Sequence, residues 1–173
     1  MTGGGRIGPP EPLGSGHDVS TFFSGSPALD DWLKRRALAN QSSGASRTYV
    51  VSRGEIVIGY YALAVGAVAA SEATGRVRRN MPDAIPVMIL ARLAIDRAEQ
   101  GRGLGRALLG DAIRRTLQAA DIAGIRAMLV HAISAEAKAF YEGTGFKPSP
   151  IDPMTLMITL DDVRRALGAG PQG

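Results

Sequence analysis

The sequence feature that most constrains the fold is a glycine-rich turn between an apolar run and a helix. Residues 87–95 are continuously apolar except for Arg92, which is typical of a strand buried on both faces. Residues 104–120 carry apolar side chains at the spacing of an amphipathic helix. Residues 101–105 lie between them and read Gly-Arg-Gly-Leu-Gly. A strand, a tight turn and a helix in this order predict a unit of an α/β sheet.

The turn has the composition of an anion-binding loop. Backbone N–H groups at a helix start have no partner within the helix, and the helix dipole favours negative charge there. Glycines allow a phosphate to approach this backbone, and Arg102 and Arg106 add positive charge beside it. The glycine order matches neither the dinucleotide fingerprint nor the P-loop, which also needs a following Lys. A flexible turn before an amphipathic helix is the alternative that this loop alone leaves open.

The rest of the chain alternates between helix and strand patterns. Ser26 and Pro27 read as the N-cap and first residue of a helix, which the polar stretch 40–46 should end. The apolar side of this helix is expected to carry Leu29, Trp32, Leu33 and Leu38. Further strands are expected at residues 47–52, 55–65, 125–131 and 154–160, helices at 134–141 and 161–167, and a loop at 69–83. The order predicts one mixed α/β domain around a central sheet.

Composition excludes several classes of function. The chain has 173 residues and no cysteine, which rules out disulfides, thiolate metal sites and cysteine nucleophiles. Its two histidines, His17 and His131, have no metal-ligand spacing, so no metal is expected. The apolar runs are far shorter than the ~20 residues of a membrane span, and the N-terminus lacks the apolar core of a signal peptide, so we expect a cytoplasmic protein. The net charge of +4 is compatible with a polyanionic partner.

Two motifs together resemble a known superfamily. Gln100-Gly-Arg-Gly-Leu-Gly105 resembles the Q/R-x-x-G-x-G/A pyrophosphate loop of the GNAT acetyltransferases, and Ala139-Phe-Tyr-Glu-Gly-Thr-Gly-Phe146 resembles their second signature. The resemblance implies an α/β (α+β) GNAT fold. In this fold a mixed, twisted central sheet of six to seven strands is flanked by helices, and splayed central strands form the acetyl-CoA cleft. We expect a flexible segment at 1–17, one acetyltransferase domain at 18–167 and a disordered tail at 168–173.

The resemblance also implies roles for single residues. Tyr141 would lie at the thioester sulfur and act in catalysis. The strand 93–95 would splay from the strand that ends at His131 and pair with the pantetheine arm, and the loop backbone would hold the pyrophosphate of acetyl-CoA. The implied cofactor-binding residues are Leu93, Ala94, Ile95, Gln100, Gly101, Arg102, Gly103, Gly105 and Arg106.

A narrower resemblance concerns the substrate. The segments Asn40–Val50, Arg92–Asp96 and Ala139–Tyr141 look like those of the GNAT toxins of bacterial toxin–antitoxin modules. That subfamily acetylates the α-amine of aminoacyl-tRNA and so stops translation. It is usually neutralised by a ribbon-helix-helix antitoxin and is often dimeric. The alternatives are a GNAT enzyme that acetylates protein or small-molecule amines, and a non-catalytic module that binds acyl-CoA.

The chemistry of the substrate bears on the need for a general base. An α-amine has a pKa of about 7.7–8.0, so roughly 10–20% of it is neutral at pH 7, and we expect direct attack with the proton leaving through water. Each acid or base near the motifs also has a structural interpretation: Asp96, Glu99, His131, Glu136 and Glu142. Tyr141 keeps its proton at neutral pH and can serve the leaving sulfur as a hydrogen-bond donor or as a general acid.

Basic side chains are the candidates for binding tRNA phosphates. The predicted tRNA-binding residues are Lys34, Arg35, Arg36, Arg47, Arg78, Arg79 and Arg92, with Arg76 in the same loop as Arg78. A helix that bears Lys-Arg-Arg is more often a solvated face. Arg92 lies in an apolar strand, where a charge needs a partner, so it either pairs internally or faces the cleft.

Overall fold

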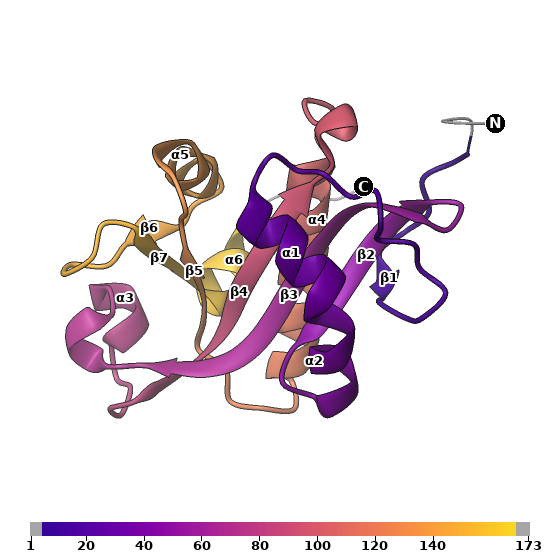
Figure 1. Ribbon diagram of the computed structural model, residues 1–173. Helices are drawn as coiled ribbons and strands as arrows, with labels where there is room; N and C mark the ends of the chain where they lie inside the picture. Colours follow the sequence, from indigo (N-terminus) through magenta and orange to yellow (C-terminus); the bar gives the residue numbers. More distant parts are fainter. Residues whose placement is uncertain (1–4, 169–173) are drawn as a thin grey trace. The chain divides into compact units, whose positions relative to one another are not determined.

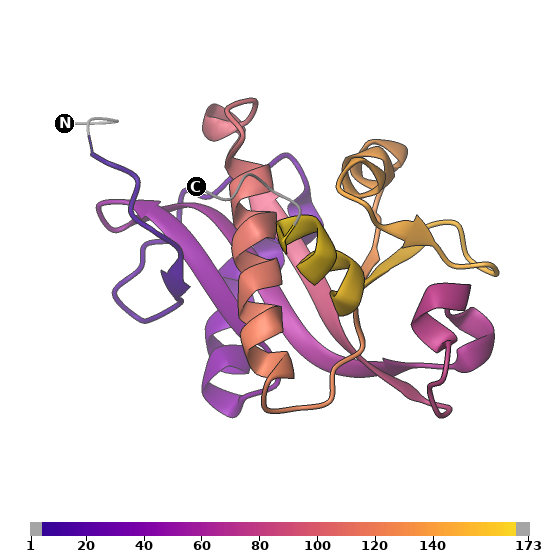
Figure 2. The same cartoon turned by 180° about the vertical axis from the view of Figure 1, so that it is seen from behind.

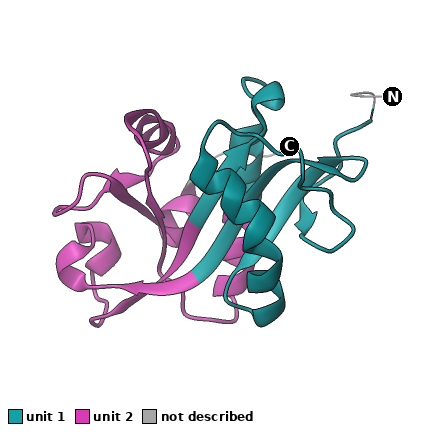
Figure 3. Cartoon of the chain, in the orientation of Figure 1, with its two compact units in different colours: residues 1–64, 91–112 teal, residues 65–90, 113–173 magenta. Residues whose placement is uncertain are grey.

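The computed structural model of the protein describes residues 5–168 and contains a seven-stranded sheet (Figure 1). The strands follow the order β1-β2-β3-β4-β5-β7-β6. The chain divides into two compact units (Figure 3). Unit 1 comprises residues 1–64 and 91–112, and unit 2 comprises residues 65–90 and 113–173. Strands β3 (Ile56–Val68) and β4 (Ile85–Ile95) and helix α4 (Leu104–Ala120) each supply residues to both units.

Unit 1 is built on an antiparallel hairpin. Strand β2 (Arg47–Arg53) pairs with β3 from Arg47 opposite Leu63 to Arg53 opposite Ile56, and Gly54 turns the chain with a φ of 61°. The two-residue strand β1 (Glu11–Pro12) adds to the outer edge of β2. Helices α1 (Pro27–Arg35) and α2 (Ala37–Ser43) lie on one face, and the start of α4 lies on the opposite face (Figures 1 and 2).

The core of unit 1 centres on a column of aromatic side chains. Tyr60 is fully buried, meets Phe22 edge to face at 5.6 Å and stacks with Trp32 at 5.9 Å. The Tyr60 hydroxyl donates a 2.7 Å hydrogen bond to the carbonyl of Leu29, so its burial leaves no unpaired polar group. These contacts fix α1 on the sheet, and Ala94 of β4 packs into the same cluster.

Unit 2 contains the parallel part of the sheet. Strand β4 pairs with β5 (Ala127–His131) from Val87 opposite Ala127 to Leu90 opposite Val130. Strand β7 (Thr155–Thr159) lies antiparallel to β5, and β6 (Lys147–Pro148) lies antiparallel to β7. The helices are α3 (Gly75–Arg78), α5 (Ala135–Gly143) and α6 (Leu160–Gly168). The core includes Val68, Val77, Ile85, Val87, Leu129 and Met157.

Most predicted elements are confirmed, and the helix predicted at 104–120 has the same bounds in the structure. The first helix is wrong in two respects. It breaks at Arg36, and α2 extends through residues 40–43, which were expected to end the helix; Leu38 is 45% exposed instead of apolar core. The expected loop at 69–83 contains a 3-10 turn (Ala70–Glu72) and α3. Strands β1 and β6, of two residues each, were missed because so short a segment has no readable periodicity.

The predicted domain boundaries stay predictions. In the N-terminal segment the N–H of Leu13 donates a 2.9 Å hydrogen bond to the carbonyl of Thr48, and the Leu13 side chain is buried. Residues 1–4 and 169–173 lie outside the described part of the chain. Within residues 5–168, no helix has the length and apolar character needed to cross a membrane, and no three metal-ligating side chains are grouped to hold a metal ion.

Gly59 offers a test of packing in unit 1, where β3 passes beneath α4. A Cβ at this position would lie 3.0 Å from the side chains of Ile95 and Val51 and 3.2 Å from Leu108. We therefore expect Gly59→Ala to destabilise the protein by about 1–3 kcal/mol and to lower its Tm by several degrees. Thermal unfolding measures this. Gly124→Ala is the matched control, because its Cβ would meet nothing within 4 Å, and equal Tm values for the two variants would contradict the packing.

Candidate active site

The glycine loop of unit 1 has a backbone conformation that explains two of its glycines. Gly101 and Gly103 both adopt a φ of 82°, in the left-handed region that other residues rarely occupy. No atom lies within 4 Å of a Cβ built on either residue, so conformation and not space requires glycine there. Gly103 also caps α4, because its carbonyl accepts the first hydrogen bond of the helix, from the N–H of Ala107 at 3.1 Å.

Gly105 is different, because nothing in unit 1 requires a glycine there. Its φ is not in the left-handed region, and its Cβ would meet only Ile95, at an ordinary 3.9 Å. The N–H groups of the first turn of α4, at residues 103–106, have no acceptor within the helix. Arg102 and Arg106 are exposed beside them. The loop is therefore a concentration of free N–H donors and positive charge, as an anion-binding site requires.

Side chains from distant segments hold the loop in place. The Gln100 amide donates 2.9 Å hydrogen bonds to the carbonyls of Ser24 and Ile95, so this side chain positions the loop. The Asp96 carboxylate accepts from the N–H groups of Phe23 and Ala98 at 3.1 and 3.0 Å. Both residues tie the end of β4 to the chain that precedes α1. The prediction that Gln100 contacts a cofactor stays a prediction.

An ion pair supports the same turn. Arg53 of β2 donates two 3.0 Å hydrogen bonds to the Glu99 carboxylate, which is largely buried. The hydrogen bonds from Arg53 hold the pKa of Glu99 below its ordinary value. Arg102 lies 3.5 Å from the same carboxylate and is 66% exposed, so it keeps most of its surface for a ligand. The structural interpretation of Glu99 is therefore confirmed.

Strand β4 continues beyond its parallel partner. The ladder with β5 ends at Leu90, and β4 runs five residues further, to Ile95. Ala94 points into the core of unit 1, while Leu93 and Ile95 are half-buried. This arrangement suits a strand whose last residues offer their backbone to an extended ligand.

Tyr141 lies in unit 2 on the last turn of α5. Its side chain is 6% exposed and packs edge to face against Phe140 at 5.1 Å and Phe146 at 5.6 Å. Burial raises the pKa of Tyr141 above its ordinary value. The hydroxyl has no hydrogen-bond partner among the described residues of this unit. Tyr141 is thus a protonated phenol with a free donor, held rigidly by two aromatic rings.

The turn after Tyr141 explains the second motif. The Tyr141 carbonyl accepts hydrogen bonds from the N–H groups of Thr144 and Phe146, at 3.0 and 3.2 Å, and from the Thr144 hydroxyl at 2.7 Å. Gly145 makes this closure possible with a φ of 106°, and a Cβ there would lie 3.3 Å from Ile158. Phe146 is then fully buried against the tyrosine ring.

His131 is the candidate base whose surroundings the sequence did not reveal. Its Nδ1 lies 2.8 Å from the Thr155 hydroxyl, which donates a 2.7 Å hydrogen bond to the Asp152 carboxylate. Since the single Thr155 proton goes to Asp152, Nδ1 must donate to the Thr155 oxygen, and in the neutral imidazole Nε2 is then the nitrogen with the lone pair. The hydrogen bond from Thr155 lowers the pKa of Asp152, which keeps that carboxylate ionised. His131 and Thr155 line a cavity of about 270 Å³ in unit 2.

The other four candidate bases lie in ordinary structural positions. Asp96 and Glu99 form the hydrogen bonds and the ion pair that hold the glycine loop in place. Glu136 lies in the first turn of α5, where the helix dipole favours an acid, and Glu142 is exposed.

In unit 1 the predicted tRNA-binding residues divide between a pocket and the open surface. Arg35, Arg36 and Arg92 line a cavity of about 460 Å³ together with Trp32 and Asn40. The Arg92 guanidinium lies over the Trp32 ring, 4.3 Å from its centroid, so Arg92 both has an internal partner and faces a pocket. The other two are not in this pocket: Lys34 is exposed on α1, and Arg47 donates to the carbonyl of Gln41 at 3.5 Å.

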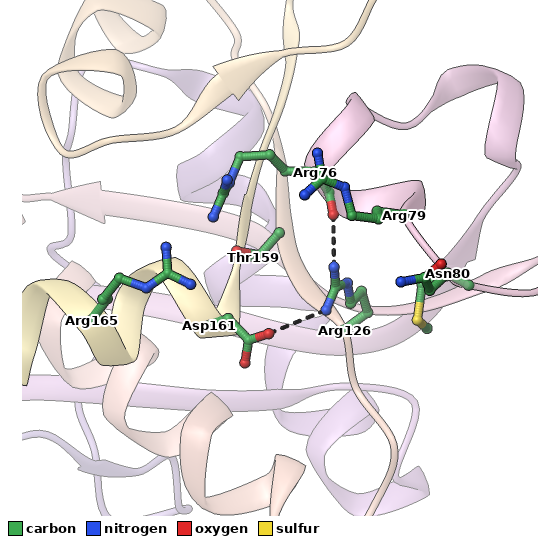
Figure 4. Close-up of a pocket in the computed structure, with 8 residues that line it drawn as sticks. Arg76, Arg79, Asn80, Arg126, Thr159, Asp161 and Arg165 are labelled. Atoms are coloured by element: carbon green, nitrogen blue, oxygen red, sulfur yellow. Dashed lines mark hydrogen bonds and ion pairs between the residues drawn. The ribbon is translucent and has the colours of Figure 1, made fainter.

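A second arginine cluster lies in unit 2 (Figure 4). Arg126 donates hydrogen bonds to the backbone carbonyls of Arg76 and Val77 and pairs with Asp161 at 3.3 Å. Arg76 forms a two-pronged ion pair with Asp162. The cavity they line, of about 310 Å³, also contains Arg79 and Arg165, but Arg78 does not line it. Sequence reasoning missed Arg126 and Arg165, since only the pairing of β5 and β7 brings them to α3.

Comparison with known proteins gives consistent results. The family model of the acetyltransferase (GNAT) domain matches residues 44–148, which include both motifs. A tRNA-acetylating toxin of Mycobacterium tuberculosis is 55% identical over 159 residues, 92% of this chain and 96% of the relative. The structure of AtaT complexed with acetyl-methionyl-tRNAfMet is 25% identical, with a TM-score of 0.87 over 94% of this chain and 99% of that chain. A mutant AtaT toxin bound to the C-terminus of the antitoxin AtaR and acetyl-CoA is 26% identical, with a TM-score of 0.80 over 94% and 99%.

The Arg53–Glu99 pair predicts how stability depends on pH. The folded-state pKa of Glu99 is depressed, so the pair stabilises the protein fully above the unfolded value of about 4.3, and this contribution is lost as pH falls through the folded value. We expect Glu99→Gln to have a lower Tm than wild type at pH 7 and a Tm closer to wild type at about pH 3. Thermal unfolding against pH measures this, with the exposed Glu55→Gln as control. A constant difference in Tm between wild type and Glu99→Gln would contradict it.

Proposed function

Because the chain belongs to the GNAT acetyltransferase family, we propose that it transfers the acetyl group of acetyl-CoA to the α-amine of an aminoacyl-tRNA and acts as the toxin of a toxin–antitoxin pair. The observation that carries the substrate is the 55% identity, over nearly the whole of both chains, to a tRNA-acetylating toxin. The family resemblance drawn from the two motifs is confirmed. The likeness to AtaT in complex with acetylated tRNA, antitoxin and acetyl-CoA supports the same substrate, partner and cosubstrate.

The glycine loop suits the pyrophosphate of acetyl-CoA. It offers free N–H donors at residues 103–106, the exposed Arg102 and Arg106, and at Gly105 a position where the protein itself tolerates a side chain. A glycine that nothing else requires is explained by a ligand that approaches the backbone closely. Leu93, Ala94 and Ile95 would pair with the pantetheine arm through their backbone. When bound, acetyl-CoA supplies an acetyl group whose C–S bond breaks as the new N–C bond forms.

Tyr141 is proposed to stabilise the departing sulfur. Its hydroxyl is protonated and has no competing acceptor within its unit, so it can donate a hydrogen bond where negative charge develops. Full proton transfer to a thiolate with a pKa near 8.5 is already uphill from an ordinary tyrosine at about 10, and burial makes it more so. We therefore assign Tyr141 as a hydrogen-bond donor, one of the two roles that the sequence left open.

His131 is proposed to accept the proton that the amine loses. In the neutral imidazole the Thr155–Asp152 chain fixes the tautomer and the ring orientation, so that Nε2 has the lone pair. An α-amine is only partly neutral at pH 7, so removing its proton as the N–C bond forms increases the rate. This proposal replaces the expectation that the proton leaves through water alone.

The remaining features follow from the same substrate. We propose one acetyltransferase domain at residues 18–167, a cytoplasmic location where charged tRNA is available, neutralisation by a ribbon-helix-helix antitoxin, and a homodimer. The basic residues that would track tRNA phosphates are Lys34, Arg35, Arg36, Arg47, Arg78, Arg79 and Arg92.

Transfer of labelled acetyl from acetyl-CoA to a pool of charged tRNA tests the function. We expect label on charged tRNA and none on deacylated tRNA, because only the charged pool presents an α-amine. Tyr141→Phe should keep its ring contacts and its Tm and lose at least about a hundredfold in rate. Label on peptides or polyamines instead of tRNA would contradict the proposed substrate and identify another amine in its place. Thermal stabilisation by acetyl-CoA without any turnover would favour a binding module.

Removal of the imidazole tests the proposed base. His131→Ala should lower kcat about tenfold or more near pH 7, and the loss should shrink at high pH, where the amine is already neutral. Thr155→Val should give a smaller loss with the same pH dependence, because it only frees the ring orientation. The pH profile of kcat measures both, with exposed Glu142→Gln as control. An unchanged profile in His131→Ala would restore direct attack without a base.

A further inference from the structure

The pocket of unit 1 between α1, α2 and β4 combines an indole with three guanidinium groups. Trp32 and Arg35 come from α1, Arg36 from the link between the helices, and Arg92 from β4. Asn40 of α2 also lines this cavity of about 460 Å³. An indole among the arginines suits a ligand that has an aromatic face as well as negative charge.

The Trp32 ring beneath Arg92 has a rigid support. The Arg92 guanidinium lies over the indole at 4.3 Å from the ring centroid. On the core side, Trp32 stacks with the fully buried Tyr60 at 5.9 Å and an interplanar angle of 13°. Tyr60 is itself fixed by its hydrogen bond to the Leu29 carbonyl. The indole is therefore held in place from the core side, and the half-exposed guanidinium of Arg92 lies over it on the pocket side.

The charges of this pocket are not neutralised from within. Arg35, Arg36 and Arg92 form no ion pair with any described residue of unit 1, and Asp31 is the one acid that lines the cavity. The cluster in unit 2 differs, because there Asp161 pairs with Arg126 (Figure 4), and Asp162 pairs with Arg76. Of the two clusters, the one in unit 1 has the greater capacity for an incoming anion.

We infer that this pocket binds the unpaired 3′ end of an RNA, with a nucleobase stacked on the Trp32–Arg92 pair and neighbouring phosphates on Arg35 and Arg36. The inference rests on the proposed function, since an aminoacyl group is attached to such an end. Unpaired bases stack on aromatic rings and on guanidinium planes, and every base has a face for this. An acidic peptide would use the charges but not the aromatic ring. Asn40 lines the same cavity, and its amide would hydrogen-bond a base edge.

Direct binding tests this pocket apart from catalysis. The probe is a fluorescently labelled RNA hairpin with an unpaired 3′ end, compared with a blunt-ended hairpin of the same stem. Wild type should bind the unpaired end about tenfold more tightly. Arg92→Lys, which keeps the charge and loses the plane, should abolish this preference, and so should Trp32→Leu, whereas Trp32→Phe should keep most of it. Arg97→Lys is the matched control, since Arg97 lies over the exposed Phe23 ring outside this pocket.

The outcomes separate the two proposals. Since Trp32 packs on Tyr60, Tm is measured for every variant, and Arg92→Lys decides the matter if Trp32→Leu does not fold. Equal binding of both hairpins by wild type, or an unchanged preference in Arg92→Lys, would overturn the inference even if tRNA is acetylated. Displacement of RNA by oligoglutamate as efficiently as by unlabelled hairpin would indicate an acidic-peptide site and also overturn it. A preference that depends on Arg92 with no acetylation of tRNA would refute the proposed function alone.

Discussion

The candidate site depends on how strand β4 ends. Its last residues pass from the apolar core of unit 1 into a turn whose left-handed conformation favours glycine, at Gly101 and Gly103. The turn is fixed from outside by the two hydrogen bonds of Gln100 and by the Arg53–Glu99 pair. With this support, the free N–H groups at the start of α4 have a defined direction before any ligand binds, and a preorganised donor array is what makes anion binding strong.

The proposed reaction needs one residue that donates a hydrogen bond and one that accepts a proton. The two residues proposed for these roles differ in burial. Tyr141 is enclosed by Phe140 and Phe146, which raises its pKa and keeps it a donor. His131 lies at the exposed end of β5, and its link to Thr155 and Asp152 makes Nε2 an acceptor. Both residues belong to unit 2, whereas the glycine loop and the Trp32–Arg92 pair belong to unit 1.

The parts of the molecule with local sequence signals could be predicted. The helix at 104–120, the glycine loop and the turn at Gly145 follow from periodicity and backbone conformation. The break at Arg36 could not be foreseen, because no glycine or proline marks it in the sequence. The hydrogen-bonded chain of His131, Thr155 and Asp152 could not be foreseen either, nor could the contact of Arg92 with Trp32. They join residues that only strand pairing and helix packing bring together, and single-residue propensities carry no such information.

The most direct test of the account is a crystal structure of the protein with a non-transferable thioether analogue of acetyl-CoA. We predict that the pyrophosphate lies on the N–H groups of residues 103–106 and that the Tyr141 hydroxyl lies within hydrogen-bond distance of the analogue's sulfur. A pyrophosphate bound away from this loop, or a Tyr141 hydroxyl that faces away from the sulfur, would contradict it.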